Sequence, residues 1–311
     1  MKRFKTISEF LQFRQLPAPE HPLICVFKVE SVERLRIEAP ASWLYDFYAI
    51  GLKRVLNAWG SKLKYGQQQY DFDNGIMSFI APGQVLSLSL DEHVTTIKQS
   101  GWMLLIHPDF LWNTPLAQAI KQYDFWDYSV HEALFLSDKE EAILVHILQT
   151  IQQECHLNID RFTKNIVISH IETLLNYADR FYHRQFITRE KANHQVLEHL
   201  EKLLTDYFNS DNLVAKGLPT VAYVAQCLNL SPKYLSSLLK VLTGQNTQQH
   251  IHEKLIEKAK EKLSTTQLSI SEIAYGLGFE HIQSFSKLFK SKPIFRRLNS
   301  GSRFSEVIEF Q

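Results

Sequence analysis

Residues 221–240 read VAYVAQCLNLSPKYLSSLLK, and residues 270–290 read ISEIAYGLGFEHIQSFSKLFK. In both segments a short helical pattern leads into a tight turn and then into a second helical pattern. A small residue, Ala225 or Ala274, lies inside each first helix, where a second helix can cross closely. Each second helix has one apolar face and one face of small, polar or basic side chains. The sequence therefore predicts two helix–turn–helix units.

The residues at the two turns suit sharp reversals of the chain. After Leu228-Asn-Leu230, Ser231 is a helix N-cap and Pro232 fits the first helical position. In the second unit, Gly278 supplies the backbone freedom that a sharp turn needs. One long helix, from Asn246 to about Leu263, joins the units. A rigid connection would place the two second helices in successive major grooves of DNA, about 34 Å apart.

The polar faces of the second helices predict contact with double-stranded DNA. Short polar side chains let a helix approach the groove, Gln can read a base edge, and Lys binds phosphate or guanine. We expect Gln283 and Ser284 to face bases, and Lys240, Lys287 and Lys290 to face mainly phosphates. A single motif of this kind could also be a plain helical hairpin with a solvated face. Two such motifs joined by one long helix favour DNA binding. The predicted DNA-contacting residues are Lys233, Tyr234, Ser236, Ser237, Lys240, His281, Gln283, Ser284, Lys287 and Lys290.

Charge is distributed unevenly along the 311 residues, although the formal net charge is only +1. Residues 1–190 hold 19 Lys and Arg against 22 Asp and Glu, whereas residues 191–311 hold 15 against 11. Within residues 231–303 the count is 12 against 5. The C-terminal part is therefore expected to have an acidic partner, for which nucleic acid is the first candidate.

The N-terminal part has the pattern of short strands followed by helices. Alternating apolar runs from Leu23 to Ile106, separated by turns such as Asp73-Asn-Gly75, predict a small β-barrel or sandwich. Ser137-Asp-Lys-Glu140 is a capping box that begins a helix. Two apolar stripes follow, which could cover the barrel or face a second subunit in a homodimer. The stripes are Ile143, Ile147, Ile151 and Cys155, then Val167, Ile171, Leu174, Ala178 and Phe181.

These patterns predict an α+β chain with two domains. The first covers residues 1–185, with a barrel over about 23–107 and helices over about 108–185. Residues 186–194 interrupt the helical pattern and are predicted to be a linker. The all-α DNA-binding domain would then cover residues 195–311. A length of 311 residues is consistent with two domains.

No catalytic, cofactor or metal site is predicted. GxSxG, Walker A, GxGxxG and HExxH motifs are absent from the sequence. His250 and His252 are two residues apart on an expected helix, so they point to different faces. His93 and His107 lack the cluster of His and Glu that a metal-binding barrel needs. An enzyme is thus unsupported, although residues distant in sequence could still converge.

The expected location is the cytoplasm. Cys25, Cys155 and Cys227 are far apart, without a CxxC pair, and are interpreted as reduced core residues. The basic N-terminus, Met1 to Lys5, is not followed by the apolar region of a secretory signal. No run of about 18 apolar residues predicts a membrane-spanning helix.

Residues about 195–292, which contain the two predicted helix–turn–helix units, resemble the DNA-binding domain of the AraC/XylS family of bacterial transcription regulators. The resemblance covers about a third of the chain and implies promoter binding, with RNA polymerase as a further partner. It also implies helices that dimerise and an N-terminal cupin-like barrel that binds a small-molecule effector. Lys254 departs from the pattern, because the family often has an Arg there. The matching residues are Ala225, Leu228, Ser231, Tyr234, Leu235, Lys240, Gly244, Ile251, Ala259, Leu263, Ile273, Ala274, Gly278, Phe279, Ser284, Phe285, Phe289 and Lys290.

Two interpretations of the N-terminal part stay open. The segment from Tyr70 to Gly83 resembles the glycine turn, strand and Pro-Gly turn of the family's barrel, without implying a particular ligand. A cupin-like small-molecule-binding module or enzyme with a helical appendage is the alternative function. Aromatic residues in this part would form either ordinary core or an effector pocket. They are Trp43, Tyr45, Phe47, Tyr48, Trp59, Tyr70 and Phe72.

The C-terminal end departs from the family resemblance. Members usually continue with a turn and a short final helix, whereas this chain matches through Lys292 and diverges at Pro293. One base inserted before the Pro293 codon would permit Thr-Asn-Leu-Ser-Pro-Leu-Glu-Phe-Arg, which restores the family ending. Residues 293–311 are therefore either a true tail or the product of a single-base deletion, which we favour. A frameshifted regulator would bind DNA less well than its in-frame version.

Overall fold

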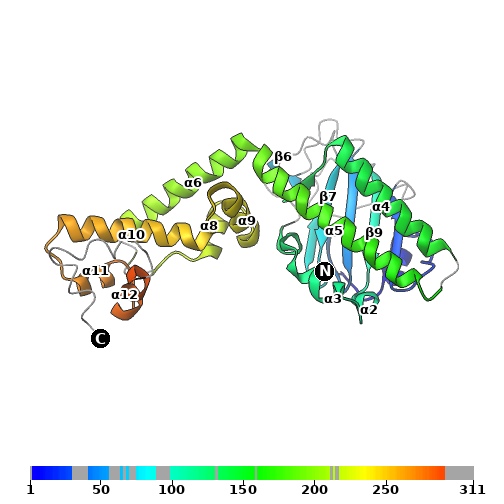
Figure 1. The fold of residues 1–311 in the computed structure, drawn as a ribbon, viewed down its shortest axis with the longest axis horizontal. Helices are drawn as coiled ribbons and strands as arrows, with labels where there is room; N and C mark the ends of the chain where they lie inside the picture. The colour runs from blue at the N-terminus through cyan, green and yellow to red at the C-terminus, as the bar shows by residue number, and fades with distance from the viewer. Residues whose placement is uncertain are drawn as a thin grey trace. The chain divides into compact units, whose positions relative to one another are not determined.

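The structure, a computed structural model, describes most of the chain as two compact units, Met1–Thr188 and Arg189–Gln311 (Figure 1). Strands and helices make up the first unit, and the described part of the second is helical. The predicted α+β class is confirmed. The described residues are 2–29, 41–55, 64–65, 68–69, 75–88, 99–129, 132–157, 160–210, 213 and 217–290.

The strands of the first unit form separate sheets within the described residues. The largest is antiparallel, in the order β10-β7-β4-β9-β2, and a second has the order β1-β3-β8. The described strands therefore do not form the closed barrel that was predicted over residues 23–107. Two strands from outside that range, β1 and β10, also belong to the sheets. The strands are β1 Lys2–Phe4, β2 Ile24–Lys28, β3 Ala41–Tyr45, β4 Tyr48–Val55, β5 Lys64–Tyr65, β6 Gln68–Gln69, β7 Ile76–Ile80, β8 Val85–Leu88, β9 Gln99–Ile106 and β10 Leu134–Phe135.

Strand β4 at the centre of the large sheet is buried on both faces because helices pack on either side. Ile50 and Leu52 share a face with Arg54, which contacts Glu141 on α4 (Asp138–His156). Ala49, on the other face, joins a core cluster with side chains of α1 (Ile7–Phe13). Alternation along the strand thus serves two separate packing layers.

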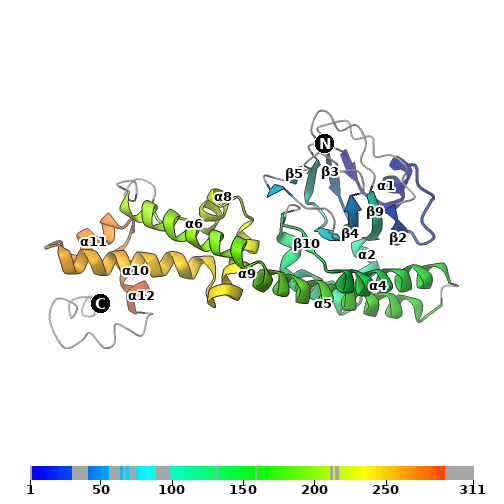
Figure 2. The same cartoon turned by 90° about the horizontal axis from the view of Figure 1, so that it is seen from above.

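Helix α4 and helix α5 (Thr163–Thr188) lie side by side across one face of the sheet (Figure 2). The capping box predicted at Ser137 and Glu140 is present at the start of α4. Smaller helices complete this layer: α2 Pro108–Leu111, α3 Leu116–Ala119, and the 3-10 helices η2 Ile120–Gln122 and η3 Asp124–Asp127.

The apolar stripes of α4 and α5 are covered within the chain. Ile147 and Ile151 are buried, as are all five residues of the predicted α5 stripe. Ile143 differs from the prediction, because it is 38% exposed while Leu144 takes its place in the core. These stripes therefore give no support for a dimer, since the sheet and the neighbouring helix of the same chain already cover them.

The linker predicted over residues 186–194 is mostly helical. Helix α5 continues to Thr188, and α6 (Glu190–Asn209) begins after the single non-helical residue Arg189. The segment contains neither Gly nor Pro, and Arg, Glu, Lys and Ala are good helix formers. The loss of apolar periodicity was therefore a poor guide to the loss of helix.

The second unit has one hydrophobic core, to which both repeats contribute. Buried residues from the elements of both repeats form a single cluster with α6 and with the connecting helix α10.

No helix among the described residues is long and apolar enough to cross a membrane. Residues 293–311, with the predicted frameshift, lie outside the described residues. The helices after α6 are α8 Val221–Cys227, α9 Pro232–Thr243, α10 Thr247–Thr265, α11 Ile270–Gly276 and α12 Ile282–Lys290.

Candidate nucleic-acid interface

The two predicted turns have the same backbone course. Asn229 and Gly278 are both left-handed, with φ of 55° and 84°. Each donates its N–H to the carbonyl three residues earlier, that of Gln226 at 3.1 Å and that of Tyr275 at 3.0 Å. The next residue in each turn donates to the carbonyl of the small alanine, at 2.9 Å and 3.1 Å. The sequence repeat is therefore a structural repeat, in which Asn tolerates the conformation that Gly adopts freely.

Helix α9 has the ends that its sequence predicts. The Ser231 hydroxyl accepts the N–H of Tyr234 at 3.3 Å, and Pro232 occupies the first helical position. The helix ends at Gly244, whose φ of 77° is the left-handed cap conformation. Both ends are fixed by local chemistry, so the start and length of this helix do not depend on a bound partner.

Four predicted DNA-contacting residues of α9 follow one another on one helix face, at spacings of three and four. Lys233 and Lys240 are exposed, whereas Ser236 and Ser237 between them are half-buried. The Ser236 hydroxyl lies 3.0 Å from the hydroxyl of Thr247, at the start of α10. Ser236 therefore ties α9 to the connecting helix, in addition to lining the polar face.

Tyr234 differs from its predicted role as a DNA contact. Only 9% of this residue is exposed, one helical turn from buried Leu238. Its position in the repeat corresponds to Ser284, which is exposed on α12. The large ring packs towards the core in the first repeat, and the small polar side chain stays at the surface in the second.

Helix α12 presents a more open polar face than α9. Gln283, Ser284 and Lys287 are exposed, as is His281 just before the helix. On the opposite face Phe285 is 1% exposed and meets the Phe279 ring edge-on at 5.3 Å. The predicted contacts of α12 are therefore available, and its apolar face is well packed. Lys290 lies in the last turn of the helix, and its side chain is outside the described residues.

The lysines of the second unit fall into two groups. Lys254 lies 3.4 Å from Glu257 and 3.9 Å from Glu201, and Lys258 lies 2.8 Å from Glu261. In contrast, Lys240 and Lys287 form no ion pair with any carboxylate of the described residues. The positive charge of Lys240 on α9 and of Lys287 on α12 is therefore left for a partner, whereas Lys254 and Lys258 on α10 are paired with carboxylates.

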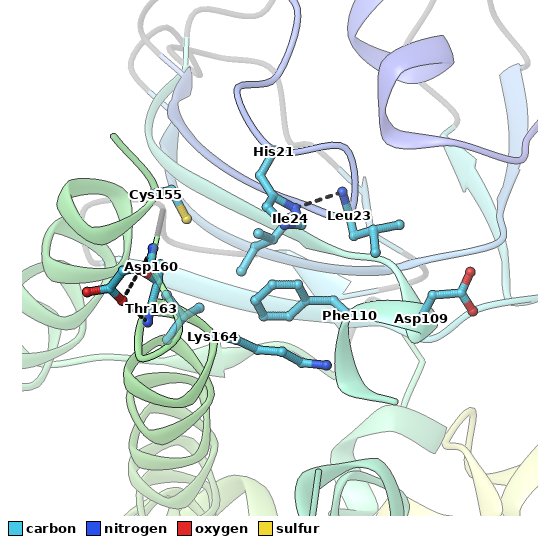
Figure 3. Close-up of a pocket in the computed structure, with 10 residues that line it drawn as sticks. His21, Leu23, Ile24, Asp109, Phe110, Cys155, Asp160, Thr163 and Lys164 are labelled. Carbon is cyan, nitrogen blue, oxygen red and sulfur yellow. Dashed lines mark hydrogen bonds between the residues drawn. The ribbon is translucent and has the colours of Figure 1, made fainter. Parts of the chain in front are cut away.

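A cavity of about 140 Å³ opens in the first unit (Figure 3). It lies at the start of β2, between α2, the end of α4 and the start of α5. Sequence reasoning missed it, because its walls come from separate segments with no shared motif. It is lined by His21, Leu23, Ile24, Asp109, Phe110, Cys155, Asp160, Thr163, Lys164 and Val167.

The polar groups that line this cavity include a histidine, a lysine and a thiol. The His21 Nδ1 accepts the N–H of Leu23 at 3.1 Å, and burial, then the charge of Lys164, lowers the pKa of His21. Lys164 Nζ donates to the carbonyl of Trp112 at 2.9 Å. Burial raises the pKa of the Cys155 thiol to about 11, so it stays protonated and is a poor nucleophile. Among the described residues no group of His, Cys, Asp and Glu could hold a metal ion.

The aromatic residues predicted to line either core or pocket are core where they are described. Tyr45, Phe47 and Tyr48 are buried, and Tyr45 stacks on Phe47 at 5.2 Å. Trp43 packs against the same cluster as Tyr45. Three further residues, Trp59, Tyr70 and Phe72, lie outside the described residues.

Comparisons with known proteins agree with the C-terminal repeat. The helix-turn-helix domain family matches residues 224–292. The HTH-type transcriptional regulator YfiF of Bacillus subtilis (strain 168) is 28% identical over 239 residues, 71% of each chain. The raffinose operon transcriptional regulatory protein RafR of Pediococcus pentosaceus is 35% identical over 86 residues. That match covers 26% of this chain and 31% of the raffinose regulator.

One solved structure aligns with the same region. It is the C-terminal domain of the two-component response regulator yesN from Fusobacterium nucleatum subsp. nucleatum ATCC 25586, at 30% identity. The alignment covers 31% of this chain and 88% of that chain, with a TM-score of 0.27. A TM-score this low does not establish a shared fold. The assignment of residues 224–292 therefore depends on the sequence matches and on the two turns. Residues 224–292 form an AraC-type helix-turn-helix domain, and the chain is a DNA-binding transcription regulator.

Proposed function

We propose that the chain reads two successive major grooves of promoter DNA, one with α9 and one with α12. The observation that carries this proposal is the repeated turn geometry, which presents two polar, lysine-bearing helix faces from one core. Gln283 and Ser284 would contact bases, and Lys240, Lys287 and Lys290 mainly phosphates. Lys233, Ser236, Ser237 and His281 would line the same two faces.

Selection of duplexes from a random DNA library with the full chain would test this reading. We expect the recovered sequences to share two conserved blocks whose centres are about one helical turn apart. Affinity should fall steeply as salt rises, because released counterions drive phosphate contacts. A single conserved block would contradict paired reading, and salt-independent binding of a small molecule alone would favour the alternative of a binding module or enzyme.

We further propose that a small-molecule effector binds the cavity of the first unit. Its volume of about 140 Å³ is close to that of an engineered apolar cavity that binds benzene. Ile24, Phe110 and Val167 supply apolar walls, and His21 and Lys164 supply N–H donors. A cupin-like barrel as the effector site stays a prediction of the family resemblance.

A screen of benzene-sized carboxylates, alcohols and amines by thermal shift would test the effector site. A ligand of this cavity should raise the melting temperature of the full chain and change its affinity for the selected DNA. Val167→Phe should fill the cavity and abolish the shift. An equal shift in that variant would place the ligand elsewhere.

The homodimer, the contact with RNA polymerase and the cytoplasmic location also belong to this proposal. The dimer and the contact with RNA polymerase follow from the family resemblance, whereas the location follows from the scattered cysteines and the basic N-terminus. The dimer no longer has the support of the α4 and α5 stripes. Sedimentation velocity of the full chain decides the first of them. A clean monomer at high micromolar concentration would remove the dimer.

A further inference from the structure

Tyr207, on α6, contacts the first repeat through its ring. The ring meets the ring of Tyr223, on α8, with centroids 5.4 Å apart and planes at 60°. Neither residue belongs to the predicted DNA-contacting set, and α6 precedes both repeats in the chain. The contact therefore fixes α6 against the first helix of the first repeat.

The hydroxyl of Tyr207 extends the contact towards the second repeat. It donates to the carbonyl of Gly217 at 3.0 Å. Gly217 in turn donates its N–H to the carbonyl of Leu213 at 2.8 Å, so Gly217 and Leu213 are tied to each other. Burial raises the pKa of Tyr207, and the phenol stays protonated and able to donate at neutral pH.

The turn of the second repeat lies directly against backbone atoms of Leu213 and Gly217. A Cβ atom built on Gly278 would come within 2.9 Å of the Leu213 carbonyl oxygen and 3.2 Å of the Gly217 Cα. Only a residue without a side chain permits such an approach. Gly278 thus has two reasons to be Gly, its positive φ and this close backbone contact.

We infer that Tyr207 is a positioning residue that holds the two repeats in one mutual arrangement, so that α9 and α12 enter their grooves together. Its ring touches the first repeat, and its hydroxyl reaches the turn of the second through Gly217. The inference rests on the proposed paired reading of DNA. Two reading helices in a fixed arrangement bind as one unit, because the second contact forms at high effective concentration.

Tyr207→Phe tests this role, because it keeps the ring and removes only the hydroxyl. The probes are a duplex selected by the wild-type chain and two versions of it, each with one conserved block scrambled. We expect the variant to lose about 5- to 10-fold in affinity for the intact duplex and less than 2-fold for either scrambled version. Equal losses on all three duplexes, or no loss, would overturn the inference.

Tyr275→Phe is the matched control. Tyr275 is an exposed tyrosine on α11 whose hydroxyl makes no hydrogen bond within the described residues, and its loss should leave all three affinities unchanged. If the wild-type chain selects no common sequence, the proposed function fails. If it selects one and Tyr207→Phe behaves like wild type, only the role of Tyr207 fails. Circular dichroism of each variant confirms that it is folded.

A pair of glycine variants gives a second, independent test. Gly217 and Gly278 both have positive φ, 70° and 84°, so alanine strains the backbone at each. A Cβ on Gly217 would meet no atom within 4 Å, whereas one on Gly278 would collide with the Leu213 carbonyl oxygen and crowd the Gly217 backbone. We expect Gly278→Ala to lose at least 10-fold more affinity for the intact duplex than Gly217→Ala. Equal effects would show that the close approach is irrelevant, and would overturn the inference.

Discussion

Lys287 is exposed on the polar face of α12 and forms no ion pair within the described residues. We predict that Lys287→Ala weakens binding to all DNA sequences, because a phosphate contact carries no sequence information. The slope of log affinity against log salt should fall by about one unit. Affinity measured from low to moderate salt on selected and random duplexes checks this, and a loss confined to the selected duplex would contradict it.

Gln283 shares that face and should behave differently. Its amide can accept and donate at a base edge, so Gln283→Ala should relax preference at one base pair, at a cost of about 1–3 kcal/mol there. Binding to random DNA should hardly change. Repeating the selection with the variant measures the effect. If Gln283→Ala and Lys287→Ala lose affinity equally on selected and random DNA, the assignment of the two roles is wrong.

Lys53, in β4, supplies a prediction about pH. Burial, and then the charge of Arg14, lowers the pKa of Lys53 to about 8. Between about pH 8 and the ordinary lysine value the unfolded chain binds more protons, so stability should rise with pH there. Lys53→Met should remove this rise and stabilise the chain at pH 7 by up to about 2 kcal/mol. Urea unfolding at pH 7 and pH 10 checks both, and a gain of equal size at the two pH values would contradict the assignment.

Single residues also show where sequence reasoning succeeds and fails. Ser231 could be predicted as an N-cap because a cap is a local arrangement of a side chain and its own backbone. The role of Tyr234 could not, because whether a residue at the edge of a helix face is buried depends on the neighbouring elements. The cluster of Tyr207, Gly217 and Gly278 joins segments that are far apart in sequence. Of the three residues, only Gly278 could be singled out from the sequence, because it lies at a predicted turn.

At the scale of elements, the capping box of α11 gives a test of local stability. The N–H and hydroxyl of Ser269 donate to the Glu272 carboxylate, and these hydrogen bonds lower the pKa of Glu272. A lowered carboxylate pKa stabilises the helix above the ordinary pKa, and that contribution is lost as pH falls through the folded value. The start of the second repeat is therefore expected to loosen only in acid.

Ser269→Ala should raise the pKa of Glu272 towards its ordinary value and destabilise α11 by about 1 kcal/mol, because the N-cap is lost. An NMR titration of the Glu272 carboxyl and thermal unfolding at pH 7 measure the two effects. Ser264→Ala is the control, since that hydroxyl donates only to a backbone carbonyl at the end of α10. An unchanged Glu272 pKa would rule out this account of the box.

Helix existence was easier to predict than helix boundaries and strand closure. The repeats and the α5 stripe carry a strong period, whereas the junction of α5 and α6 carries no helix breaker and is still interrupted at the non-helical Arg189. The strands alternate as predicted, but alternation specifies which face is buried and leaves open which edges meet. Pairing such as that of β1 with β3 joins residues about 40 apart in sequence, which no local pattern encodes.

At the scale of the whole molecule, the C-terminal tail gives the next prediction. A final helix of the family type would pack on the apolar face of α12, where Phe285 is already buried. We predict that a chain with the in-frame ending from residue 293 binds the selected duplex more tightly, because further apolar burial of about 1.5–3 kcal/mol per side chain would hold α12 more firmly. Affinities of the two versions on one duplex check this, and equal values would make the final helix dispensable.

Resequencing the gene tests the origin of the tail. A confirmed reading frame, with close relatives carrying the same ending, would exclude a single-base deletion. The DNA affinity of the chain and the origin of its tail are separate questions, since a chain with a true tail can also bind DNA weakly. The comparison of the two versions therefore stands whichever origin is found.

The single core of the second unit has a consequence for how the protein fails. Side chains from α8 through α12 share one cluster, so the unit should unfold as one cooperative block, and amide hydrogens of α9 and α12 should exchange at similar rates. Damage to either repeat then lowers the folded fraction of both, and proteases clear what is unfolded. A cell would lose such a chain altogether, and would not accumulate a half-functional competitor that occupies promoters through one groove.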